Sequence, residues 1–315
     1  TQTTSKSRID TERYTAEWLQ RVAWGPLGFS TGGFEFKDEE AEAAFKNTVT
    51  QWALFFQHQL DLGDRLTLIG GTRHLRHNIF GHETTAEASA SYRVPVVETR
   101  LRGSFSMGFR APDMNELFFP NFGNTSLLPE ESRTFEIGIE KDWWERRLTG
   151  ALSLYHTEVD QLIQTVRVSS TSSQPQNVAE AEMEGFELEG AVEPVTGLRL
   201  STNWTYTDAE DETANEELLR IPRNRATFAV AYDFLERWQL HLDTTIVSSR
   251  EESVATNRRL PTKGYYTVDG VLNFQATKHV LLYGRIDNIF NRHYSEVLGF
   301  PAAGTLFFIG GKIDI

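Results

Sequence analysis

Apolar and polar residues alternate with a period of two along most of the chain. From residue 99 to residue 110 the odd positions are mostly apolar, as at Leu101 and Phe105, whereas the even positions carry Arg100, Arg102 and Arg110. Such alternation puts the two sets of side chains on opposite faces of a β-strand. The pattern recurs at 51–57, 135–140 and 238–243. The runs last about 11–14 residues, close to the length with which a tilted strand crosses a bilayer.

The alternation predicts about 15 strands. They are expected at 11–24, 27–38, 47–60, 65–77, 82–93, 98–110, 131–141, 146–159, 180–192, 197–208, 224–234, 237–248, 264–276, 279–289 and 304–315. Every second connection is tight, and those between are mostly long and polar, at 38–46, 111–130, 160–179, 209–223, 249–263 and 290–303. Separating short turns from long loops in this way is typical of an up-and-down membrane barrel. Residues 1–315 are therefore predicted to form one all-β, antiparallel transmembrane β-barrel domain.

The composition is compatible with that prediction. Hydrophobic residues make up 39% of the chain, and no stretch approaches 18 uninterrupted apolar residues, so transmembrane helices are excluded. A membrane strand needs an apolar residue only at every second position. A soluble sandwich alternates too, but its strands seldom exceed about 10 residues. The 12% of aromatic residues also need an apolar environment.

The strand count suggests an incomplete barrel. A single-chain bacterial barrel has an even number of strands, and both of its ends lie on the periplasmic side. Fifteen strands that begin at a long-loop end leave an unpaired edge at 11–24, which is costly in lipid. An open wall is therefore expected, to be completed by more chain or by another chain.

The net charge and the absence of cysteine exclude or disfavour several classes of function. The chain has 31 Lys+Arg against 44 Asp+Glu, a net charge of -13, which disfavours nucleic acid as a partner. It contains no cysteine, which excludes disulfides, thiolate metal sites and cysteine nucleophiles.

From about residue 80 onward the sequence resembles the TonB-dependent outer-membrane receptors, in particular the cobalamin and ferric-siderophore group. The motifs that carry the resemblance are GFRAP at 108–112, EL at 116–117, N at 124, LPE at 128–130, S at 132, E at 136, G at 138, NVAE at 177–180, EGFELE at 184–189, YTVD at 266–269, DNIFN at 287–291 and Y at 294. They occur in the family's order and spacing over some 230 residues.

The resemblance implies a fold and a function. The family has a 22-stranded barrel with an N-terminal plug domain and a segment that engages TonB. Neither the plug nor that segment has a counterpart in these residues, which resemble the C-terminal part of the barrel. The implied protein lies in the outer membrane of a Gram-negative-type bacterium, in contact with its lipid. It binds a small-molecule or metal-chelate ligand, such as siderophore iron or cobalamin, at its outer loops and imports it by TonB-driven gating. The alternative is a plugless passive pore or a structural barrel subunit of an envelope assembly.

Exposed loop aromatics are the candidate ligand contacts: Phe118, Phe119, Phe122, Tyr294 and Phe300. Large apolar side chains in a loop are unfavourable in water unless they bind something or cover the barrel mouth, and both interpretations stay open. Arg100, Arg102 and Arg110 are predicted to face the lumen, since each costs about 2–4 kcal/mol against lipid at the midplane. There they either contact a plug or pair with carboxylates such as Glu136 and Glu140.

Other patterns predict no cofactor and no catalysis. Asp208, Glu210 and Asp211 could offer oxygen ligands to Ca²⁺, but their spacing lacks the order of a dedicated calcium loop and favours a solvated acidic loop. His74, His77 and His82 are clustered in the sequence, but His74 and His77 are three apart in a strand and should point to opposite faces, so no metal site is expected. The GxSxG sequence at 28–32 continues into a strand rather than a helix, unlike a hydrolase elbow. The chain is therefore predicted not to be an enzyme.

Overall fold

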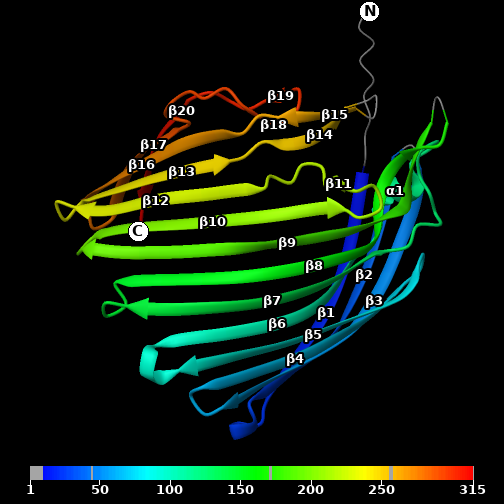
Figure 1. Ribbon diagram of the computed structural model, residues 1–315, viewed down its shortest axis with the longest axis horizontal. Coiled ribbons are helices and arrows are strands. Elements are labelled where there is room, and N and C mark those ends of the chain that lie inside the picture. The colour runs from blue at the N-terminus through cyan, green and yellow to red at the C-terminus, as the bar shows by residue number, and fades with distance from the viewer. Residues whose placement is uncertain (1–9, 44, 170–171, 255–257, 315) are drawn as a thin grey trace, which may run out of the picture.

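The computed structural model describes residues 10–43, 45–169, 172–254 and 258–314, and most of them belong to one antiparallel sheet (Figure 1). Its strands, in spatial and chain order, are β1 (Asp10–Ala23), β2 (Phe29–Glu42), β3 (Lys46–Leu62), β4 (Leu66–His77), β5 (Gly81–Val94), β6 (Thr99–Arg110), β7 (Glu130–Trp143), β8 (Leu148–Arg167), β9 (Ser173–Val195), β10 (Leu198–Asp211), β12 (Asn224–Phe234), β13 (Trp238–Val247), β16 (Tyr265–Thr277), β17 (Val280–Asp287) and β20 (Leu306–Ile313). The short β11 (Glu216–Glu217) pairs with the end of β10. These 15 consecutive strands confirm the predicted all-β, up-and-down arrangement.

The register shows why alternating sequences form this sheet. Phe105 on β6 lies opposite Phe135 on β7, and their ring centroids are 4.8 Å apart. Ile137, two residues further along β7, lies opposite Leu154 on β8. Directly opposite residues share a face, so the apolar positions of successive strands merge into one continuous apolar face. The intervening residues form a polar face.

The sheet curves into an open wall (Figure 1). The sheet path begins at β1 and ends at β20, and among the described residues no pairing joins these two strands. The expected open edge is therefore present at β1. Most side chains have some exposure because both faces of a single-layer wall are accessible. Among the described residues, buried apolar side chains are few: Ala41, Ala53, Leu75, Leu117, Leu127, Ala179, Ala181, Ala209 and Val247.

Turns and loops lie at opposite ends of the strands (Figure 1). At the turn edge the connections are short, as at residues 63–65 and 196–197. The loop edge carries the short helix α1 (Met114–Phe118) and two small hairpins, β14 (Arg250–Val254) with β15 (Arg258–Thr262) and β18 (Ser295–Val297) with β19 (Phe300–Pro301). Within the described residues, no helix is long and apolar enough to span a membrane.

Two predicted long loops are wrong. Residues 38–46 are mostly strand, because β2 continues to Glu42 and β3 begins at Lys46. Residues 160–179 are likewise mostly strand, because β8 and β9 pair as far as Arg167 and Ser173. In the β2–β3 hairpin the ladder continues through the mostly acidic run at 38–42, where the alternation of apolar and polar residues is lost. In the β8–β9 hairpin a register irregularity between Val159 and Ile163 interrupts the alternation, and both strands continue beyond it. Periodicity alone does not distinguish such segments from loops.

Candidate functional site

The loop edge carries two clusters of side chains that hold the loops together. The first begins at α1, which follows β6. The Asp113 carboxylate accepts hydrogen bonds from the backbone N–H groups of Asn115 and Glu116 at 2.7 and 2.8 Å. In return, the Glu116 carboxylate accepts the Asp113 N–H at 2.8 Å. This capping box satisfies donors that have no partner within the helix, and it fixes the position of the Glu116 carboxylate.

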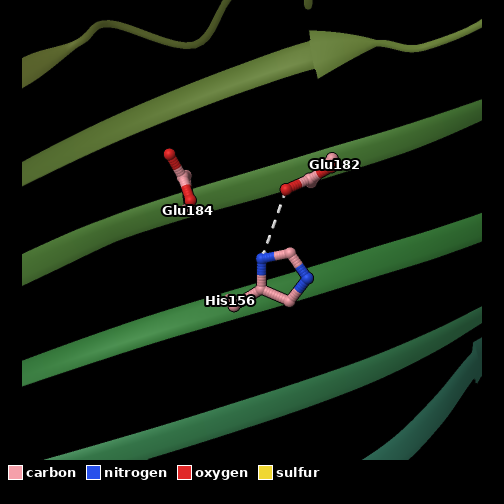
Figure 2. A group of neighbouring side chains, drawn as sticks. All are labelled: His156, Glu182 and Glu184. Carbon is pink, nitrogen blue, oxygen red and sulfur yellow. Dashed lines mark ion pairs between the residues drawn. The ribbon is translucent and has the colours of Figure 1, made fainter.

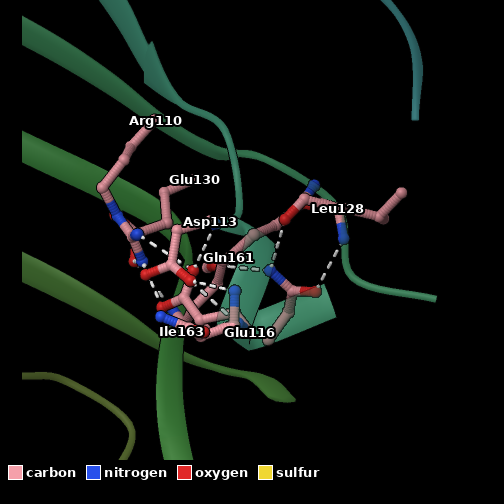
Figure 3. Close-up of polar contacts among 9 residues, drawn as sticks. Arg110, Asp113, Glu116, Leu128, Glu130, Gln161 and Ile163 are labelled. Atoms are coloured by element: carbon pink, nitrogen blue, oxygen red, sulfur yellow. Dashed lines mark hydrogen bonds and ion pairs between the residues drawn. The ribbon is translucent and has the colours of Figure 1, made fainter. Parts of the chain in front are cut away.

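Arg110, the last residue of β6, lies between two carboxylates. Its Nε is 2.7 Å from Glu130 Oε2, and its Nη1 is 3.1 Å from Glu116 Oε2. Glu130 Oε1 also accepts the backbone N–H of Ile163 on β8 at 2.8 Å. Strands β6, β7 and β8 and helix α1 are thus joined through one guanidinium and two carboxylates (Figure 3).

Asn177 on β9 ties the same loop to the β8–β9 hairpin. Its Nδ2 donates to the carbonyls of Leu128 and Gln161 at 2.9 and 2.7 Å, and its Oδ1 accepts the Leu128 N–H at 2.9 Å. Most of these residues belong to the motifs that carry the family resemblance, so the motifs encode loop structure. We call the following residues the α1 cluster: Arg110, Asp113, Glu116, Leu128, Glu130 and Asn177. Figure 3 labels all of them except Asn177.

The second cluster joins three loops nearer the C-terminus. Its centre is Glu252 on β14, which is only 2% exposed. The Glu252 carboxylate accepts hydrogen bonds from the side chain of Arg220, before β12, and from the backbone N–H of Leu298, before β19, the latter at 3.4 Å. The backbone N–H of Arg220 donates to the backbone carbonyl of Glu251 at 2.8 Å. These four residues, Arg220, Glu251, Glu252 and Leu298, are the Glu252 cluster. No sequence motif pointed to it, because its partners come from three separate loops.

The three phenylalanines of the loop after β6 lie around α1. The Phe118 ring centroid is 6.1 Å from that of Phe45, at the β2–β3 connection. Phe119 is 42% exposed and Phe122 is half-buried. Phe118 therefore packs against the β2–β3 hairpin, whereas Phe119 is accessible from solvent.

The two aromatic candidates of the last loop, Tyr294 and Phe300, differ in their packing and exposure. Tyr294 stacks on Tyr265 with ring centroids 4.1 Å apart. Burial, followed by the carboxylates of Glu296 and Asp269, raises the pKa of Tyr294 above its ordinary value. Phe300 is 73% exposed. Across the described part of the chain, no hydrogen bond or ring contact connects this pair with the phenylalanines near α1.

The arginines of β6 are paired with carboxylates. Arg102 Nη1 is 2.8 Å from Glu140 Oε1, and its Nε is 3.7 Å from Glu136 Oε1. Arg100 Nη1 lies 3.7 Å from Glu140 Oε2. Arg102 also donates to Ser153 Oγ at 2.8 Å. The carboxylate pairing considered from the sequence is therefore present on the polar face of β6 and β7.

The acidic residues at the end of β10 do not converge. Asp208 and Glu210 share one face of the strand, whereas Asp211 points to the other face. Asp211 accepts hydrogen bonds from Gln164 Nε2 and from the Ala214 N–H, both at 2.8 Å. Asp208 Oδ1 lies 3.2 Å from Arg223 Nη2. The Asp211 oxygens are thus already used to fold the loop.

The histidines near the end of β4 separate as their spacing predicted. His74 stacks on His82 of β5 with centroids 5.4 Å apart, and His77 stacks on Phe80 at 4.0 Å. His74 and His77 therefore have different neighbours.

The sheet register also brings together a Ser–His pair that the sequence did not predict. Ser30 Oγ in the GxSxG stretch is 2.9 Å from His58 Nδ1, on the neighbouring strand. Ser30 is 8% exposed, and its oxygen also accepts the indole N–H of Trp24 at 2.9 Å. The described residues place no carboxylate in a hydrogen bond or ion pair with His58 that could orient it as a base. The three side chains satisfy one another's polar atoms at the apolar face.

These features define an outer-membrane-type β-barrel wall whose loops are joined on one edge. The family model described as "TonB dependent receptor-like, beta-barrel" matches residues 3–289. The chain therefore belongs to the TonB-dependent receptor β-barrel family, whose members lie in the outer membrane of Gram-negative bacteria. The family suggested by the sequence motifs is confirmed.

Individual relatives agree with this assignment. The chain is 28% identical over 304 residues to the vitamin B12 transporter BtuB of Photobacterium profundum, which covers 92% of this chain and 48% of the transporter. It is 26% identical over 273 residues to the metal-pseudopaline receptor CntO of Pseudomonas aeruginosa, covering 79% of this chain and 38% of the receptor. The chain thus spans less than half the length of these two relatives.

Solved structures share the fold. The copper transporter OprC superposes with a TM-score of 0.84 at 17% identity, over 98% of this chain and 57% of that chain. The ferric enterobactin receptor PfeA of Pseudomonas aeruginosa gives a TM-score of 0.81 at 16% identity, over 97% of this chain and 54% of that chain. At these identities the likeness supports the transmembrane barrel fold alone.

Proposed function

We propose that this chain forms part of the barrel of a receptor that imports a scarce nutrient complex of the siderophore–iron or cobalamin class. The observation that carries the proposal is the family match over residues 3–289, together with relatives named as a vitamin B12 transporter and a metal-pseudopaline receptor. The ligand binds at the loop edge, and energy delivered through TonB opens the passage. The receptor makes and breaks no covalent bond, so it needs no catalytic residue and no resident cofactor.

The two loop clusters support this function physically. Loops whose positions are defined before a large ligand arrives bind it more tightly, because ordering them on binding costs free energy. The α1 cluster fixes the loop that carries Phe118, Phe119 and Phe122. The Glu252 cluster holds the last loop, which carries Tyr294 and Phe300. We propose that these five aromatics contact the ligand, with Phe119 and Phe300 the most accessible of them.

We further propose that the polar face of the wall lines the lumen and that the apolar face contacts lipid. On this view Arg100, Arg102 and Arg110 face the interior, while Leu101 and Phe105 face the hydrocarbon. The pairing of Arg100 and Arg102 with Glu140 supports this orientation, because paired charges fit a polar passage better than lipid. Spin labels at positions 101, 102, 104 and 105 should fall into two classes. A lipid-soluble quencher should reach the labels at 101 and 105 but not those at 102 and 104. A quenched label at 102 with an unquenched one at 105 would contradict the orientation.

Uptake measurements test the transport proposal. A strain lacking this protein should lose growth on one member of a panel of iron–siderophore complexes and cobalamins, and expression of the protein should restore it. The restored uptake of the radiolabelled ligand should stop when TonB is deleted. Uptake that persists without TonB would instead support the passive pore. Failure of every ligand to rescue growth would count against an import receptor of this class.

A further inference from the structure

We propose that His156, Glu182 and Glu184 form a binding site for a divalent transition-metal ion of the Zn²⁺ class on the apolar side of the wall. The three side chains come from the adjacent strands β8 and β9 (Figure 2). Each offers one ligand atom, and these atoms all lie within 4.8 Å of one another. Imidazole nitrogen and carboxylate oxygen are ordinary zinc donors. The site does not depend on the transport function, and it differs from the acidic residues considered for Ca²⁺.

The sheet register places these residues side by side. His156 lies directly opposite Glu184, and Glu158 lies opposite Glu182. Opposite residues in an antiparallel pair point to the same face, and so do residues two apart in one strand. The backbone ladder therefore gathers the imidazole and the carboxylates into one patch, without any loop.

The distances suit a metal ion. Zinc bonds of about 2.0–2.2 Å place tetrahedral ligand atoms about 3.3–3.6 Å apart. His156 Nδ1 and Glu182 Oε1 are already 3.3 Å apart. Glu184 is exposed, so its carboxylate can approach the pair by a change of rotamer. Three protein ligands leave room for water, as in open zinc sites.

Glu158 can orient the imidazole. It lies on the other side of the ring, with Oε1 3.6 Å from His156 Nε2. A carboxylate near the second ring nitrogen of a ligating histidine fixes its tautomer and raises its basicity. Arg133 in turn holds the surrounding acids, at 3.8 Å from Glu158 Oε2 and 3.3 Å from Asp160 Oδ2.

The charge around the site favours a cation. Among the described residues, neither Glu182 nor Glu184 forms an ion pair with a lysine or arginine. On β10, Asp208 and Glu210 lie opposite Glu184 and Glu182. Asp208 is paired with Arg223, whereas Glu210 is exposed and adds negative charge to the same face.

The site lies where the apolar face ends. On β8 the side chains of this face change from Leu154 to His156, and on β9 they change from Phe186 to Glu184. The site is thus the first charged row beyond the apolar band, on the side of the loop edge. Its partial exposure, 38% for the His156 side chain and 41% for Glu182, leaves it open to ions from solution.

A titration of the purified protein with Zn²⁺ tests the proposal. The protein in detergent, first stripped with a chelator, should bind one Zn²⁺ at this site by calorimetry. His156→Ala should abolish this binding, and the double variant Glu182→Gln/Glu184→Gln should weaken it at least tenfold. Glu158→Gln should weaken it about tenfold, because it removes only the orienting carboxylate.

Matched controls lie on the other face of the same sheet. Glu187→Gln/Glu189→Gln removes two carboxylates at the same spacing on β9, and His241→Ala removes an exposed strand histidine on β13. Both should leave Zn²⁺ binding unchanged, and circular dichroism should confirm that every variant keeps its sheet. Equal binding by the wild type and His156→Ala, or no saturable binding at all, would overturn the proposal.

A second readout does not depend on any variant. Cu²⁺ bound to the wild type should give an electron paramagnetic resonance spectrum with coupling to one imidazole nitrogen, and Zn²⁺ should displace it. A spectrum with oxygen ligands alone would also overturn the proposal. These measurements do not involve ligand uptake. The metal-site proposal and the transport proposal can therefore fail independently of each other.

Discussion

The two clusters at the loop edge hold their loops in different ways. The α1 cluster distributes its bonds over a capping box, a guanidinium between two carboxylates and an asparagine that bridges backbone groups. The Glu252 cluster instead directs two bonds, one from the Arg220 side chain and one from the Leu298 backbone N–H, to a single carboxylate, supported by one backbone bond from Arg220 to Glu251. A shared acceptor makes the second cluster sensitive to one substitution, whereas the first has overlapping supports.

The largest effect is expected for Glu252→Ala. The substitution leaves the Leu298 N–H without its acceptor, at a cost of about 1–3 kcal/mol, and removes a side chain that is among the largest fully buried ones. The Arg220 side chain is 62% exposed, so loss of its ion pair adds little. Hydrogen exchange should show faster exchange in residues 212–223, 248–252 and 288–305. Glu251→Ala, which keeps the backbone carbonyl bound by Arg220, is the control. Unchanged protection in Glu252→Ala would contradict the central role of this carboxylate.

Asn177→Ala should have a smaller and more local effect. The variant loses three hydrogen bonds to backbone groups of Leu128 and Gln161, of which water can replace a part. We expect a loss of about 1–2 kcal/mol in the local opening free energy of residues 124–130. The Gln176 side chain on the same strand makes none of these bonds, so Gln176→Ala should leave the loop protected. Equal exchange rates in the two variants would show that Asn177 does not specifically stabilise the loop.

The two carboxylates around Arg110 should differ. Glu130→Gln weakens the contacts to both Arg110 and the Ile163 N–H, and its side chain is 12% exposed, so a loss of about 1 kcal/mol is expected. Glu116→Gln should change stability by less, because glutamine can still complete a capping box and Arg110 keeps Glu130. Thermal melts of the two variants, followed by circular dichroism, make the comparison. A larger effect from Glu116→Gln would reverse the order inferred from the contacts.

The strands were predictable from the sequence because their pattern is local. The predicted strand 131–141 corresponds to β7 at Glu130–Trp143, and alternation alone separates Arg102 from Phe105. Most members of the α1 cluster belong to the family motifs, but the motifs did not predict that these residues contact one another. The Glu252 cluster was not predictable, because a glutamate in a polar segment gives no sign of being buried. The Ser30–His58 and His156–Glu184 pairs depend on strand register, which no single strand encodes.

The smallest effect is expected at the ion pair between Arg259 on β15, the strand that pairs with β14, and Glu216 on β11. Arg259 Nη1 is 2.6 Å from Glu216 Oε2, but the Glu216 side chain is 54% exposed. Exposed ion pairs contribute about 0–1 kcal/mol, because water and salt screen them. The guanidinium also donates to the Glu217 carbonyl, which a side-chain substitution leaves in place. Glu216→Gln should therefore leave hydrogen exchange in residues 212–223 close to that of the wild type, and any difference should shrink as salt is added. A loss comparable to that of Glu252→Ala would mean that the loops are held by their exposed charges rather than by the buried carboxylate.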